Sequence, residues 1–206
     1  MTHPRPNVVP YITAWSAERT VLPELVMHPR RAIGYADETI HDRDEHGVLW
    51  ARMTLAYGKG KPMWRRVHFQ RQRRAMRKLL CQVCGRPADR NEQGVLWLLG
   101  DDRRAWPNWP EGMAATHPPV CLPCAQIATQ LCPYLQQGFV AVRVGDSEVA
   151  AVYGERYAPR PPFPRVEEDA ITHLDDPRIR WVIAAQLVRE LFDCTIVDLD
   201  EEVRRT

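Results

Sequence analysis

Four cysteines in this 206-residue chain have the spacing of a metal site. Cys81 and Cys84 form one Cys-x-x-Cys pair, Cys121 and Cys124 form a second, and residues 85–120 separate the two pairs. Two thiolates spaced in this way can bind one ion from a tight turn, and zinc prefers four such ligands in a tetrahedron. The pattern therefore predicts one structural Zn²⁺ ion held by all four thiolates.

Other chemistries of paired cysteines were weighed against zinc. Four thiolates also suit an iron–sulfur cluster, and a single Cys-x-x-Cys can be a redox centre. No apolar leader begins the chain, so we expect the reducing cytoplasm, where disulfides are rare. The remaining thiol and imidazole candidates are expected to be structural or solvated residues: Cys132, Cys194, His117, His41 and His46.

Local elements must present the four thiolates. Gly85 follows the first pair and allows the positive φ of a sharp metal-binding turn. The second pair begins an apolar segment that ends at Pro133, so we expect a helix over 120–132 whose N–H groups face the thiolates. A strand is expected over 94–99, between the pairs.

Further elements follow from periodicity and turn residues. Residues 32–36 and 48–57 are expected to form a strand pair, and alternation about Gly145 predicts a hairpin of strands 139–144 and 148–153. Asp176 and Pro177 are suitable N-cap and first-turn residues for a helix over 178–192, with a last strand over 195–199.

A basic helix is expected directly before the first pair, over 64–80. Its apolar residues fall on one arc at 100° per residue, and its cations fall on the opposite arc. The cations expected to face solvent are Arg66, Arg71, Arg73, Arg74, Arg77 and Lys78. They belong to a stretch, residues 46–88, that contains no Asp or Glu, whereas residues 167–202 are strongly acidic.

The Cys81–Pro133 segment resembles the treble-clef scaffold of HNH-family endonucleases, ribosomal zinc proteins and small nucleic-acid-binding modules. The run around Leu80–Ala88 and Cys121–Ala125 also resembles a group of actinobacterial proteins, which implies a shared zinc module and no particular activity. HNH nucleases carry a general-base histidine in the hairpin and a metal-binding histidine on the following helix. Neither 95–102 nor 125–131 contains a histidine, so the chain lacks both the general base and the metal ligand that nuclease chemistry requires at these positions.

We therefore expect an α+β protein built on a treble-clef zinc site, with flanking hairpins and a C-terminal helix. Its expected parts are an irregular segment 1–30, a zinc-organised core 31–155, and a Pro-rich connector with an acidic helix and strand, 156–206. No run of apolar residues is long enough for a membrane span.

Three functions were compared. The basic helix favours non-catalytic nucleic-acid binding, with DNA as the expected partner and little sequence preference. The alternative is a protein-interaction or regulatory adaptor presenting Trp106 and Trp109, with the acidic C-terminal part masking the basic face. The third is a degenerate HNH-like nuclease or another enzyme, for which the chain shows no recognisable catalytic group.

Overall fold

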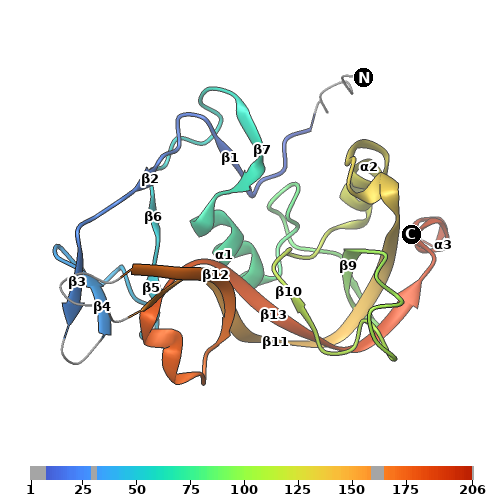
Figure 1. Cartoon of the computed structure of the whole chain (residues 1–206). Helices are drawn as coiled ribbons and strands as arrows, with labels where there is room; N and C mark the ends of the chain where they lie inside the picture. Colours follow the sequence, from blue (N-terminus) through green and yellow to red (C-terminus); the bar gives the residue numbers. More distant parts are fainter. Residues whose placement is uncertain (1–7, 29–31, 159–164, 206) are drawn as a thin grey trace. The chain divides into compact units, whose positions relative to one another are not determined.

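The computed structural model describes residues 8–28, 32–158 and 165–205 and contains both helices and strands, which confirms the α+β class (Figure 1). The chain forms two compact units that are interleaved along the sequence. The cysteine unit comprises 1–13, 71–149 and 189–206, and the second unit comprises 14–70 and 150–188. In the described part of the chain, no helix has the length and apolarity needed to cross a membrane.

The described part of the cysteine unit is a small antiparallel sheet with three α-helices and one 3₁₀ helix. Its elements are α1 (Phe69–Lys78, from residue 71 on), β8 (Arg90–Asn91), β9 (Gly94–Gly100), β10 (Met113–Ala115), α2 (Leu122–Leu131), the 3₁₀ helix η1 (Leu135–Gln137), the first part of β11 (Phe139–Ala158), the last part of β13 (Val182–Val197) and α3 (Leu199–Arg204). β9 pairs with β8 on one side and with residues 139–144 of β11 on the other. The strand predicted over 94–99 and the helix predicted over 120–132 are both confirmed.

Alternation along β9 gives the cysteine unit two apolar layers. Leu96 and Leu98 pack with Cys81, Cys124 and α2, and Leu199 of α3 joins the same cluster. Val95, Trp97 and Leu99 project to the opposite face, where they pack with other strands and with Trp109. Cys81 and Cys124 are thus buried in a hydrophobic cluster, and the half-buried Cys84 and Cys121 pack against it.

The second unit is built almost entirely of short strands. They are β1 (Thr13–Trp15), β2 (Thr20–Val21), β3 (Leu25–His28), β4 (Ala32–Tyr35), β5 (Leu49–Trp50), β6 (Arg52–Met53), β7 (Pro62–Val67) and β12 (Arg165–His173), together with the 3₁₀ helix η2 (Pro177–Trp181) and parts of β11 and β13. β4 pairs with β3, β6 with β2, and β5 runs parallel to β13. The strands expected over 32–57 exist, but the expected pairing of 32–36 with 48–57 is wrong.

The N-terminal expectation needs a similar correction. Residues 8–28 contain three short strands, although an irregular segment was expected over 1–30. The Pro-rich connector at 159–164 and the first seven residues lie outside the described part of the chain.

The hairpin predicted about Gly145 is wrong, because β11 continues through it as one strand of 20 residues. The glycine serves close packing instead of a turn: a Cβ there would lie 2.1 Å from Asp193 Oδ2 in β13. Gly154 plays the same part in the second unit, where a Cβ would lie 2.1 Å from the Ile183 carbonyl oxygen. Glycine inside a strand commonly marks such an approach of another backbone.

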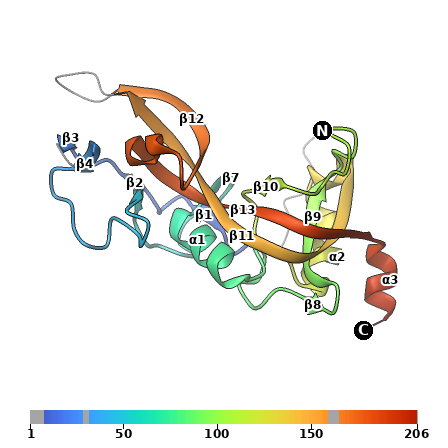
Figure 2. The ribbon, with the colours of Figure 1, turned by 90° about the horizontal axis from the view of Figure 1, so that it is seen from below.

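The helix predicted over 178–192 is also wrong. Asp176 does act as an N-cap, accepting from the Arg178 N–H, but the helix is η2 and ends at Trp181. The following residues form β13, whose partner changes from β5 at residues 183–184 to β10 at residues 189–191. The buried positions of β13 are therefore spaced three to four residues apart, as in a helix. Among the described residues, the α-helix at the C-terminal end is α3 (Figure 2).

The basic helix is shorter than predicted. Residues 62–67 form β7, and α1 begins only at Phe69. Arg66 is therefore on a strand, where its Nη2 donates to Thr20 Oγ1. The remaining five predicted cations do lie on α1.

Candidate metal centre

The four cysteines predicted as ligands come together in one cluster. The sulfur atoms of Cys81, Cys84, Cys121 and Cys124 all lie within 4.8 Å of one another, and none forms a disulfide. The Cys84 and Cys121 sulfurs are 3.8 Å apart. Sulfurs about 2.3 Å from a tetrahedral ion are separated by about 3.8 Å, so this donor set fits one metal ion.

The first pair sits in a tight turn. The Gly85 N–H donates to the Cys81 carbonyl at 2.8 Å, and the Cys81 N–H donates to the Arg86 carbonyl at 2.7 Å. Gly85 has a φ of +70°, as the sequence predicted, and a Cβ there would also lie 3.0 Å from the Tyr11 ring. Both the backbone conformation and the contact with Tyr11 favour glycine.

The second pair opens α2. Cys121 is the N-cap residue and Cys124 lies in the first turn, behind Pro123. Backbone hydrogen bonds bring this end of the helix to the first pair: the Gln82 N–H donates to the Pro119 carbonyl at 2.9 Å. Along the chain, the metal centre is therefore built from a turn that carries the first pair, the hairpin β8–β9, and a helix that carries the second pair.

Local hydrogen bonds adjust the acidity of the thiols. Burial raises the pKa of the Cys81 thiol to about 11, and burial also raises the pKa of Cys124. For Cys84, burial acts to raise the pKa, but hydrogen bonds from the Arg86 backbone and side chain and from the Cys81 and Cys121 thiols together lower the pKa to about 7. Cys84 is therefore the thiol best prepared to bind an ion as a thiolate.

The site's neighbours include a segment that sequence reasoning missed. The Tyr11 N–H donates to the Val83 carbonyl at 2.8 Å, which places residues 11–13 beside the first pair. Arg71 of α1 holds the same segment, since its Nε donates to the Tyr11 carbonyl at 2.7 Å and its Nη2 to the Thr13 carbonyl at 2.9 Å. The segment thus ties α1 to the metal-binding turn.

Comparisons with known protein families, with curated proteins and with solved structures found no match.

The predicted cations of α1 separate into two groups. Arg71 is 8% exposed and is occupied by backbone carbonyls, so its predicted place on the solvent face is wrong. Arg73 is half-buried, whereas Arg74, Arg77 and Lys78 are exposed. The exposed three are spaced i, i+3 and i+4, which places them on one face of the helix.

Three of the tryptophans belong to the core. Trp50, Trp97 and Trp109 are buried, so they are not available for stacking or for a protein partner. Trp106 is 40% exposed, and its Nε1 donates to the Glu111 carbonyl at 3.2 Å. The loop at 106–110 therefore presents one aromatic ring instead of the two expected.

Several acidic C-terminal residues form ion pairs within their own unit. Glu167 and Glu168 pair with Arg156, and Asp176 pairs with Arg178. Glu201 pairs with Arg205 at 3.1 Å.

Glu202 has a structural role in the cysteine unit. Its carboxylate, 4% exposed, accepts from the Arg143 guanidinium, with 2.8 Å between Nε and Oε2. The same guanidinium lies 2.6 Å from Asp89, which precedes β8. This buried cluster fastens α3 to the β8–β9 hairpin, and sequence patterns offered no signal for it.

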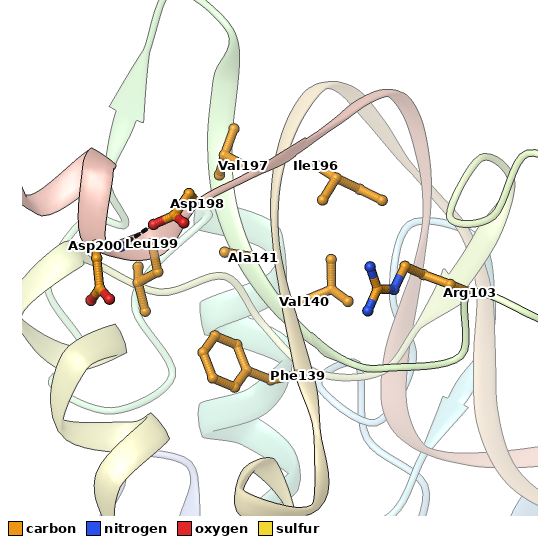
Figure 3. A pocket seen from close by; sticks show the side chains of 9 residues that line it. All are labelled: Arg103, Phe139, Val140, Ala141, Ile196, Val197, Asp198, Leu199 and Asp200. Atoms are coloured by element: carbon orange, nitrogen blue, oxygen red, sulfur yellow. Dashed lines mark hydrogen bonds between the residues drawn. The ribbon is translucent and has the colours of Figure 1, made fainter.

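A shallow hollow of about 260 Å³ lies beside α3 (Figure 3). Phe139, Val140 and Ala141 line it from β11, with Ile196 and Val197 from β13. Two of its three charged side chains are already engaged: Arg103 pairs with Asp101 at 2.6 Å, and Asp198 accepts from the Asp200 N–H as the N-cap of α3. The hollow therefore resembles a gap between packed elements more than a reaction site.

His117 lies outside the metal cluster. Its side chain is exposed, with Nδ1 3.2 Å from Thr116 Oγ1. Asp44, between His41 and His46, accepts from the His46 N–H and from Trp50 Nε1, so it stabilises the loop. Neither histidine region forms a second cluster of metal-binding atoms among the residues described here.

Proposed function

We propose that this chain is a zinc-stabilised, non-catalytic protein that binds nucleic acid, with DNA as the expected partner and little sequence preference. The supporting observation is the exposed face of Arg74, Arg77 and Lys78 on α1, a helix tied to the metal-binding turn through residues 11–13. Cations on one face of a rigid helix can contact successive phosphates.

Zinc is the proposed ion because the donor set is four sulfurs at single-ion spacing. An iron–sulfur cluster is larger than one ion and would hold the thiolates farther apart. Four thiolates close the coordination shell, which suits a structural site without bound water. Metal analysis of the purified protein should therefore give one zinc per chain.

The location in the cytoplasm also remains a proposal. All six cysteines are free thiols, as is usual for proteins in a reducing compartment.

A salt-dependent titration tests the nucleic-acid proposal. The zinc-loaded protein is titrated into a labelled DNA duplex at several salt concentrations, and the result is compared with Arg74→Ala/Arg77→Ala/Lys78→Ala. The slope of log K against log salt should become shallower by about 2.7, since each of the three lost phosphate contacts contributes about 0.9.

The matched control changes cations of the same unit that lie elsewhere. Arg103 and Arg104 are exposed in the loop after β9, and their replacement by alanine should leave the slope unchanged. If the wild-type protein binds no duplex at low salt, the proposal fails and a protein partner becomes the next candidate.

A further inference from the structure

A second exposed basic surface lies in the second unit, on what we call the ribbon, residues 15–22 and 52–67. The two segments run side by side: β2 pairs with β6, β1 pairs with β7, and the Ser16 N–H donates to the Lys61 carbonyl at 2.8 Å (Figure 1). The basic helix predicted over 64–80 overlaps this surface only at residues 64–67, which belong to the strand β7.

The ribbon carries unneutralised positive charge. Arg19, Lys59, Lys61 and Arg65 are exposed, and the described part of the chain provides no ion pair for any of them. The sequence contains no acid between residues 46 and 88. Polyanions are therefore the ligands that this surface would attract.

The one acid within the ribbon is turned away from solvent. Glu18 is 1% exposed, and its carboxylate accepts from the Trp15 N–H at 2.8 Å and the Ala56 N–H at 3.3 Å. It also lies 3.6 Å from Nε2 of the buried His68. The charge of Glu18 is thus used inside the unit and does not offset the surface cations.

Two aromatic rings are exposed among these cations. Tyr57 is 56% exposed and Trp64 is 39% exposed, although aromatic side chains of this size are usually buried. The Tyr57 ring meets the Trp15 ring edge-on, with centroids 6.0 Å apart, which holds it in place while more than half of its surface faces solvent. Exposed, fixed rings between cations suit the stacking of unpaired bases.

The turn between the rings is held in one conformation. Gly58 and Gly60, which flank Lys59, have φ values of +75° and +86°. A Cβ at residue 60 would lie 2.2 Å from Ser16 Oγ, and the Lys61 N–H donates to that oxygen at 2.9 Å. The close approach of the two segments thus defines where Lys59 and Lys61 leave the backbone.

We propose that the ribbon is a binding site for single-stranded nucleic acid, in which Tyr57 and Trp64 stack on bases and Arg19, Lys59, Lys61 and Arg65 contact phosphates. The inference rests on the proposed nucleic-acid function and adds a second site with a different substrate class. In a duplex the bases are paired and stacked on one another, so the aromatic rings contribute little to duplex binding.

Fluorescence anisotropy of the zinc-loaded, 206-residue chain tests this site. The probes are a labelled oligothymidylate strand and a labelled duplex of equal length. Each ring that stacks on a base contributes about 5- to 150-fold to affinity. Tyr57→Ala/Trp64→Ala should therefore lose at least tenfold in affinity for the strand and less than twofold for the duplex.

Two further variants separate stacking from general apolar contact and from misfolding. Trp64→Phe keeps a flat ring and should retain strand binding. Leu55→Ala removes an aliphatic side chain that is 76% exposed on the same ribbon, and it should bind the strand like the wild type. Circular dichroism and zinc content of each variant confirm folding.

The outcomes distinguish this inference from the proposed function. If the ribbon variant binds the strand normally while the α1 variant loses duplex binding, the inference is wrong and the proposed function stands. If neither probe binds the wild type at low salt, both fail. If instead anionic phosphatidylserine vesicles bind the wild type through Tyr57 and Trp64 and the strand does not, the ribbon is a lipid-facing surface and the inference is overturned.

Discussion

Replacement of Arg71 by methionine separates a structural cation from a binding cation on the same helix. Arg71 and Arg74 both appear as surface cations in a helical projection, yet only Arg74 is exposed. Methionine keeps most of the aliphatic volume of arginine and removes the guanidinium. In the folded protein, Arg71→Met would leave the carbonyls of Tyr11 and Thr13 without their donor.

The magnitude follows from those two hydrogen bonds. A buried acceptor that loses its partner costs about 1–3 kcal/mol, so two carbonyls lower the free energy of unfolding by about 3 kcal/mol. Arg74→Met removes one exposed bond of 3.2 Å to the Tyr11 hydroxyl and should cost less than about 0.5 kcal/mol. The order reverses for duplex affinity, which Arg74→Met should reduce and Arg71→Met should leave unchanged.

Urea unfolding at a fixed free zinc concentration measures the first quantity, and anisotropy without urea measures the second. Fixed zinc is needed because metal binding is part of the folding free energy. The reasoning is refuted if Arg71→Met unfolds at the wild-type urea concentration and weakens duplex binding as Arg74→Met does. That result would mean that Arg71 faces the ligand and that residues 11–13 do not depend on it.

Three further predictions concern other parts of the chain. Cys84→Ser should reduce zinc content and unfold the cysteine unit, because structural zinc contributes about 10–16 kcal/mol to folding in small domains; a full zinc equivalent with an unchanged Tm would contradict the site. Glu202→Ala should lower the free energy of unfolding by about 3 kcal/mol, because the guanidinium of Arg143, which is 1% exposed, loses one of its carboxylate partners. Glu201→Ala breaks an exposed ion pair and should cost less than about 0.5 kcal/mol in the same urea assay. Asp42→Asn should remove a pH-dependent contribution to stability. The hydrogen bond from Arg52 lowers the pKa of Asp42 from 3.8 in the unfolded chain to about 2 in the folded protein. The carboxylate therefore adds about 2 kcal/mol to the free energy of unfolding at pH values above 3.8, and this contribution is lost as the pH falls through about 2. The stability difference between Asp42→Asn and the wild type should accordingly shrink when urea midpoints are followed from neutral pH to about pH 3, and a constant difference would contradict the ion pair with Arg52.

Charge patterns along the sequence were informative only in part. The acid-free stretch at 46–88 does contain exposed cations, but it contributes them to two different elements, α1 and the ribbon. Arg71 and Arg66 are cations of the same stretch that hydrogen-bond within the protein. Composition cannot distinguish the two kinds, because the partners are carbonyls or hydroxyls about 50 residues away in the chain.

The sequence by itself determined the features that depend on neighbouring residues. Cys81, Cys84, Cys121 and Cys124 were found from spacing alone, because two residues between ligands is a property of one turn. The requirement for Gly85, the extent of α2 and the strand at 94–99 followed from local conformational preference in the same way.

Only the tertiary structure decided the features that depend on distant partners. In the sequence Gly145 is typical of a turn, but in the structure it allows the close approach of Asp193. The apolar residues of β13 have a helical spacing, and the strand partners of β13 change along its length. The pairing of β5 with β13, the burial of Arg71 and the Arg143–Glu202 contact have the same origin. Periodicity reports which residues avoid water, whereas strand pairing and long-range hydrogen bonds are set by which segments meet when the chain folds.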